Sequence, residues 1–206
     1  MRYLLFTMAL LLLLCRVSRA QIGLRVFNYR PTGELGFVMK PLFSAELSCI
    51  APFEDGRWRT QFSLTYLRLK PRMDTFPVYG VVSSGSTGTT VYPGTQSFQK
   101  YSIVQLSGGG DFAFIDKDPF YVFAGADIVV GGASVEYTSQ VQTIKDESYS
   151  GGGILAGFRF RLGAEYDVND QVGIIASANR NYLFISEPAG LYGANDYGIG
   201  LRYSFH

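Results

Sequence analysis

The sequence is poor in the residue types from which most catalytic and metal sites are built. Its 206 residues include one histidine, His206, and two cysteines, Cys15 and Cys49. A Ser/His hydrolase would need His206 as its base, although this residue lies beyond the last predicted strand. A metal site would lack the usual clusters of histidine and cysteine. We therefore expect no enzyme activity, no cofactor and no metal.

An excess of one charge and long apolar segments are missing as well. The chain has 18 basic and 17 acidic residues, a net charge of +1, and so gives no electrostatic reason to bind nucleic acid. Beyond residue 20, no apolar run approaches the roughly 20 residues that a membrane-spanning helix needs. If the protein crosses a membrane, it must do so with strands.

The first 20 residues have the features of a secretory signal peptide. They combine a basic start, an apolar run over residues 4–14 and small residues at positions 18 and 20. We expect cleavage before Gln21, which leaves residues 21–206 as one domain. An N-terminal membrane anchor and a lipoprotein attached at Cys15 are weaker alternatives. Cleavage would leave Cys49 as the single cysteine, which excludes a small scaffold held together by internal disulfides.

Beyond Gln21, apolar and polar residues alternate with a period of two, and helical periodicity is scarce. The alternation predicts eight strands, over residues 22–29, 37–53, 57–67, 102–114, 120–138, 154–166, 172–184 and 197–205. Each strand has an apolar face and an opposite face of glycine, serine and charged residues. In the last strand the apolar face consists of Tyr197, Ile199, Leu201, Tyr203 and Phe205.

The connections between these strands alternate in length. Short turns are predicted at residues 54–56, 116–119 and 169–171, and long loops at 74–96, 141–150 and 186–196. The first connection, at residues 31–34, is a short exception among the long ones. The short turns should therefore lie at one end of the sheet and the long loops at the other.

The apolar faces suit contact with lipid. Aromatic residues gather toward their ends, as in the girdles of membrane barrels, while the polar faces suit a narrow interior filled by side chains. A soluble secreted barrel that binds a lipophilic ligand is the alternative, with the apolar faces turned inward.

With its terminal aromatic residues Tyr203 and Phe205, the chain resembles the small eight-stranded outer-membrane barrels of the OmpA/OmpX type over residues 21–206. The resemblance implies an all-β fold, an eight-stranded antiparallel up-and-down transmembrane β-barrel in the outer membrane of a Gram-negative bacterium. Both termini would lie in the periplasm. It also implies that the barrel-assembly machinery reads the terminal strand as its insertion signal, although His206 makes Phe205 the penultimate residue.

The inward polar faces would form a network of charges in the barrel lumen. We expect it to consist of Arg25, Lys40, Glu46, Arg59, Asp111, Asp127, Arg159, Arg161, Glu165 and Arg202. Isolated buried charges are costly, so the simplest interpretation is a set of paired charges that fills the lumen. The alternative is the charged constriction of a narrow channel. Asp127 and Glu165 could form an acid–base pair, but their arginine-rich surroundings favour a structural role.

The long loop at residues 74–96 is the candidate site for a partner, since Phe76, Tyr79 and Tyr92 stand there among small residues. The sequence thus predicts a structural, surface-interaction or envelope-complex accessory role. The expected partners are outer-membrane lipid, the barrel-assembly machinery and an envelope or surface protein.

Overall fold

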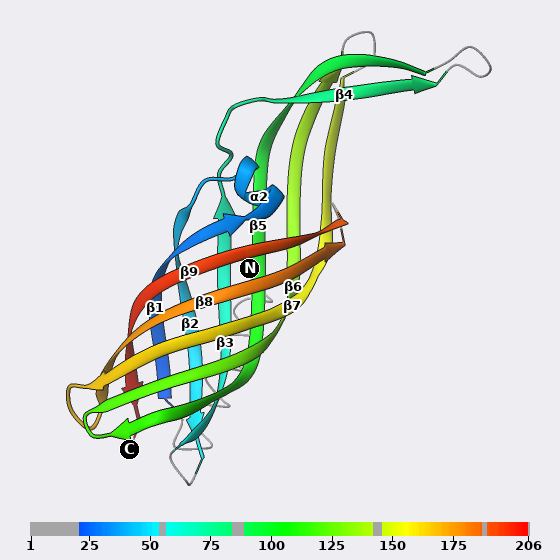
Figure 1. Cartoon of the computed structure of the whole chain (residues 1–206). Helices are drawn as coiled ribbons and strands as arrows, with labels where there is room; N and C mark the ends of the chain where they lie inside the picture. Colours follow the sequence, from blue (N-terminus) through cyan, green and yellow to red (C-terminus); the bar gives the residue numbers. More distant parts are fainter. Residues whose placement is uncertain (1–20, 54–56, 84–88, 142–145, 187–188, 206) are drawn as a thin grey trace.

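The computed structural model describes residues 21–53, 57–83, 89–141, 146–186 and 189–205 (Figure 1). The predicted signal peptide, the predicted turn at 54–56 and His206 lie outside these ranges. No helix within them is long and apolar enough to cross a membrane.

The described residues form nine strands and one short helix. In chain order these are β1 (Gln21–Thr32), α2 (Gly33–Val38), β2 (Leu42–Pro52), β3 (Trp58–Leu69), β4 (Phe76–Ser83), β5 (Thr89–Lys117), β6 (Phe120–Val141), β7 (Glu147–Asp167), β8 (Val172–Ser186) and β9 (Ala189–Ser204). All strand pairs are antiparallel.

Eight of these strands close into a barrel. Strands that follow one another in the chain pair, except that β3 pairs with β5 and not with β4. The barrel closes where β9 pairs with β1 along the whole of β1, from Gln21 opposite Ser204 to Thr32 opposite Gly193. Closure satisfies the edge hydrogen bonds of the first and last strands, which lipid cannot do. The predicted eight-stranded antiparallel barrel is confirmed.

The apolar faces of the barrel point outward. Trp58, Phe160 and Leu201 are 49%, 53% and 59% exposed, whereas Arg159 and Glu165 are 4% and 5% exposed. The soluble alternative requires the opposite arrangement and is excluded. At the short-turn end, aromatic pairs encircle the belt, with ring centroids 4.9 to 5.1 Å apart: Trp58–Phe112, Phe120–Tyr166 and Tyr203–Phe205.

At the other end, the sheet continues beyond the barrel. β3 pairs with β5 only from Tyr101 onward, and β8 pairs with β7 only from Leu155 onward. The remaining parts, which are β4 and residues 89–100 of β5, 136–141 of β6 and 147–154 of β7, project together away from the barrel (Figure 1). We call this four-stranded sheet the extension.

Strands replace much of the three predicted long loops, which corrects that prediction. Residues 76–83 and 89–96 form a hairpin within the predicted loop at 74–96, and strands also occupy much of 141–150 and 186–196. Residues 74–96 are rich in glycine, serine and threonine, residues 141–150 are polar, and residues 186–196 contain proline and glycine, so alternation is weak in all three segments. Cross-strand pairing overrides such local preferences, because strand propensity depends strongly on context.

A second correction concerns the strand predicted at 37–53. Its first residues, including Phe37, belong to α2, and β2 begins only at Leu42. Gly33 has a φ of +64°, in the left-handed region that glycine adopts without strain, and this residue turns the chain from β1 into α2.

Candidate functional site

A layer of buried ion pairs fills the half of the barrel nearer the short turns. Arg159 on β7 lies at its centre. Its Nε donates to Asp127 Oδ2 at 2.7 Å, and Nη1 donates to Glu46 Oε2. Its Nη2 donates to the hydroxyls of Ser63 and Ser107 at 2.9 and 2.5 Å. One guanidinium therefore ties together strands β2, β3, β5, β6 and β7.

A second arginine, Arg59 on β3, extends the layer toward the short turns. Its Nε lies 3.1 Å from Asp111 Oδ2, and its Nη1 lies 2.7 Å from Glu165 Oε2. The rings of Tyr121 and Phe123 cover its guanidinium, with centroids 4.4 and 4.2 Å from the central carbon. Such contacts are strongest where the cation is desolvated.

Three more arginines complete the layer. Arg161 Nη2 lies 2.8 Å from Asp111 and 2.9 Å from Asp127. Arg25 Nη2 lies 2.7 Å from Asp196 Oδ1, and its Nη1 donates to Ser177. Arg202 pairs with both Glu165 and Asp167.

Two glycines make room for these side chains. Gly109 on β5 and Gly125 on β6 point into the lumen, where an added Cβ would overlap carboxylate oxygens of Asp127 and Asp111, respectively. Glycine at these positions thus leaves room for Asp111 between Arg59 and Arg161, and for Asp127 between Arg159 and Arg161.

The structure therefore brings together nine of the ten residues predicted for the lumen, all of them buried. Lys40 is the exception, and its placement in the lumen was wrong. The chain breaks the alternation at Lys40 and Pro41, between α2 and β2, so Met39 and Leu42 both turn inward while Lys40 is exposed.

The sequence interpretation missed Asp196, which is 3% exposed. The sequence predicts the end of a loop at this position, but Asp196 lies on the same face of β9 as Arg202. The two residues are an even number of positions apart, and this spacing could have identified Asp196 as a lumen residue. With Asp196, five buried arginines face five buried acids, so the layer is neutral.

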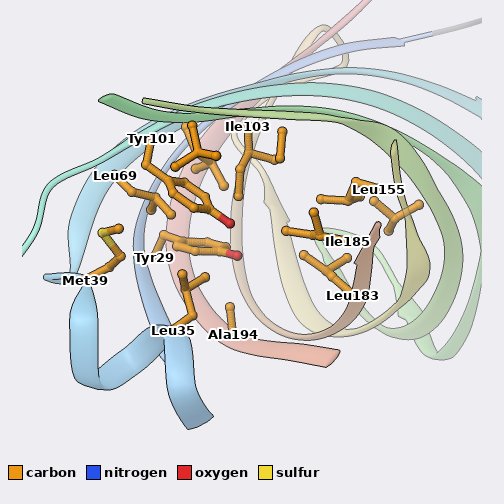
Figure 2. Close-up of a cluster of buried hydrophobic side chains, with 14 of the residues drawn as sticks. Tyr29, Leu35, Met39, Leu69, Tyr101, Ile103, Leu155, Leu183, Ile185 and Ala194 are labelled. Atoms are coloured by element: carbon orange, nitrogen blue, oxygen red, sulfur yellow. The ribbon is translucent and has the colours of Figure 1, made fainter. Parts of the chain in front are cut away.

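The half of the interior nearer the extension, which we call the outer half, is apolar (Figure 2). Six residues line it from five strands, each 3% exposed or less: Tyr29, Leu67, Ile103, Leu155, Leu183 and Ile185. Leu35 of α2 and Met39 pack against the tyrosines at one side of this cluster. An eight-stranded barrel leaves an interior just wide enough for side chains to fill, and here apolar groups fill its outer half.

Two cavities inside the barrel border the ion pairs. A polar funnel of about 520 Å³ opens among the short turns and reaches Arg59, Glu165 and Arg202. Beyond Arg59, a void of about 20 Å³ lies beside Arg25 and Arg161, enough for about one water molecule. Among the described residues, no three His, Cys, Asp or Glu side chains are grouped to hold a metal ion.

The extension carries a row of aromatic rings across its four strands. Phe76, Phe98, Tyr137 and Tyr149 follow one another with centroids 5.7, 5.9 and 5.0 Å apart. Phe98, Tyr137 and Tyr149 also pack against the apolar cluster inside the barrel. The row therefore continues the apolar interior onto one face of the extension.

The structure divides the three aromatic residues predicted for partner contact between two faces. Phe76 lies opposite Gln96, and Tyr92 lies opposite Gly80. All four positions are even-numbered, and alternate residues of a strand share a face, so Phe76 and Tyr92 both lie on the face of the aromatic row. Tyr79 pairs with Pro93 on the opposite face and is 71% exposed.

The five residues of the predicted insertion signal lie together on the outer face of β9 and just beyond it. Tyr197, Ile199, Leu201, Tyr203 and Phe205 are between 43% and 70% exposed. Their recognition by the assembly machinery stays a prediction.

The sequence matches no protein-family model and no curated protein. Solved structures share its fold. Neisserial surface protein A is similar, with a TM-score of 0.57 and 17% identity over 91% of this chain and 98% of that one. Ail from Yersinia pestis, in complex with a heparin analogue, has a TM-score of 0.49 and 14% identity over 90% and 97%. A major outer membrane protein from Thermus thermophilus has 0.49 and 13% over 90% and 99%.

The likeness to Neisserial surface protein A shows the fold, which is that of the small outer-membrane β-barrels. Together with the outward apolar belt, this fold places the protein in the outer membrane, with the extension on the side of the longer connections.

Proposed function

We propose that the protein is a non-conducting surface-interaction barrel, which anchors the extension at the cell surface for contact with a partner protein. The observation that carries this proposal is the filled interior. Ion pairs occupy one half and an apolar cluster the other. The proposed role involves no chemical step on a substrate.

The filled interior argues against the channel alternative. An ion would have to break several charge-assisted hydrogen bonds around Arg59 and Arg159, and then cross an apolar segment. Breaking one buried ion pair costs about 3–5 kcal/mol. The neutral layer also offers no net charge to select an ion.

The extension supports contact with a protein. Within the described ranges, β4 pairs with β5 along one edge and with no strand along the other. Exposed strand edges bind extended peptides, whose side chains then contact the flanking faces. Tyr79 and Val91, 71% and 55% exposed, would supply apolar contacts on one face.

The test shortens the hairpin. Phe76 and Gln96 lie directly opposite each other, so Asn-Gly in place of residues 77–95 would join them by a two-residue turn. We expect the wild-type protein in nanodiscs to bind members of an array of extended apolar peptides, and the shortened variant to bind them at least about tenfold more weakly. Leu191→Ser, which removes another exposed apolar side chain outside the extension, should bind like the wild type.

Equal binding by the shortened and wild-type proteins would contradict the role of the extension. Both proteins should also show no single-channel steps in planar bilayers. Steady conductance by the wild type would instead favour the channel.

A further inference from the structure

The outer face of β3 changes character abruptly along its length. Its outward side chains are first apolar or small and then, from Arg68 near the strand end onward, cationic: Trp58, Thr60, Phe62, Leu64, Tyr66, Arg68, Lys70 and Arg72. Leu67 and Leu69, on either side of Arg68, are buried, which fixes the outward direction of Arg68 and Lys70. Arg68 stands two residues beyond the aromatic Tyr66, a rise of about 7 Å.

A fourth cation, Lys40, joins this row from the neighbouring chain segment. Met39 and Pro71 form an isolated bridge, and Lys40 N donates to Lys70 O at 2.8 Å. The Arg72 side chain is held in place as well, because its Nε donates to the carbonyls of Gly36 and Met39 at 2.8 and 3.1 Å. We call Lys40, Arg68, Lys70 and Arg72 the cationic corner.

The cationic corner contrasts with the five arginines of the lumen, each of which pairs with a buried acid. All four side chains are exposed, and no carboxylate of the described residues lies within ion-pairing distance of any of them. By comparison, the exposed Lys100 pairs with Glu136 at 3.1 Å. Four cations thus lie near one another without a counter-ion among the residues that the structure describes.

We infer that the cationic corner binds the phosphate-bearing headgroup of a lipid in the leaflet that faces the cell exterior. The position of the corner selects this occupant. A lipid whose acyl chains pack on Phe62 and Leu64 would have its headgroup just past Tyr66, at the level of Arg68 and Lys70. Guanidinium and ammonium groups are the usual partners of phosphate oxygens.

This inference is independent of the proposed function, because the corner lies at the end of β3 and no step involves the hairpin of β4 and β5. A failure of the peptide-binding test would leave it standing, and the reverse is also true.

The test compares the affinities of two spin-labelled lipids for the barrel in phosphatidylcholine vesicles. We expect wild-type protein at low salt to prefer labelled phosphatidic acid to labelled phosphatidylcholine. The double variant Arg68→Gln/Lys70→Gln should reduce this preference by at least roughly fivefold, since a single interfacial cation contributes about that factor at low salt.

The matched control is Arg57→Gln/Lys117→Gln, which removes two exposed cations at the short-turn end and should keep the preference within about twofold of the wild type. The exchange Arg68→Lys/Lys70→Arg should keep it as well. Three results would overturn the inference: no preference in the wild type, an equal loss in the control, or displacement of the labelled lipid by millimolar inorganic phosphate. The last result would show that the corner recognises a free anion.

Discussion

Replacement of Arg159 by methionine is expected to lower the free energy of unfolding of the membrane-embedded barrel by about 3–5 kcal/mol. Arg159 is 4% exposed and donates to Glu46, Asp127 and two serine hydroxyls. Methionine matches much of the side-chain volume but leaves Glu46 and Asp127 without their central counter-charge. Urea-induced unfolding in lipid vesicles, followed by the fluorescence of Trp58, measures the change.

Two further variants separate lost charge pairing from lost packing. Lys100→Met breaks an exposed pair with Glu136 and should cost less than about 1 kcal/mol. Adding Glu46→Gln to Arg159→Met restores equal numbers of buried arginines and acids, because Asp127 keeps its pair with Arg161, and this double variant should be more stable than Arg159→Met alone. Equal losses in Arg159→Met and Lys100→Met would show that the buried layer does not hold the strands together.

The second large effect is expected on the outer surface. Ile199→Arg should lower the free energy of unfolding by about 2–4 kcal/mol, because it places a charge on the lipid face of a barrel between its girdles. Ile199 is 70% exposed, and its cross-strand neighbours on the same face are Val26 and Ala176. The same vesicle unfolding assay applies.

Tyr79→Arg provides the control for this prediction. Tyr79 is 71% exposed, almost the same as Ile199, but it lies on the extension and should face water. A surface substitution of this kind usually changes stability by no more than about 0.5 kcal/mol. If both arginines cost the same, the belt around Ile199 does not contact acyl chains.

Alternation was sufficient to predict the barrel and its orientation. A period of two is a direct consequence of strand geometry, and apolar faces that end in aromatics, such as that of β3 from Trp58 to Tyr66, indicate a lipid-facing belt. Nine lumen charges followed from the same parity. The prediction fails at Lys40, because the irregularity at Lys40 and Pro41 reverses parity. Pro41 is the signal that could have marked it, since proline within a strand pattern indicates a strand start, an edge or a bulge.

The apolar outer half of the lumen could also have been read from the sequence. Leu67, Val135 and Leu155 stand on faces that are otherwise polar, each toward the long-loop end of its strand. Their shared position becomes evident only once the strands are aligned. The hairpin of β4 and β5 was harder to predict, because glycine and threonine there give weak alternation, and only pairing with β6 shows that these strands continue.

The measurement that tests the central claim most directly is the quenching of tryptophan by lipids brominated along their acyl chains. The chain has one tryptophan, Trp58, and the variant Trp58→Phe/Phe160→Trp moves the probe along the predicted belt. Both probes should be quenched, with Trp58 responding most to bromine near the headgroups and the probe at 160 to bromine deeper in the chains. If brominated lipids leave both probes bright while aqueous acrylamide quenches them, the apolar face does not contact lipid, and the assignment of inside and outside is wrong.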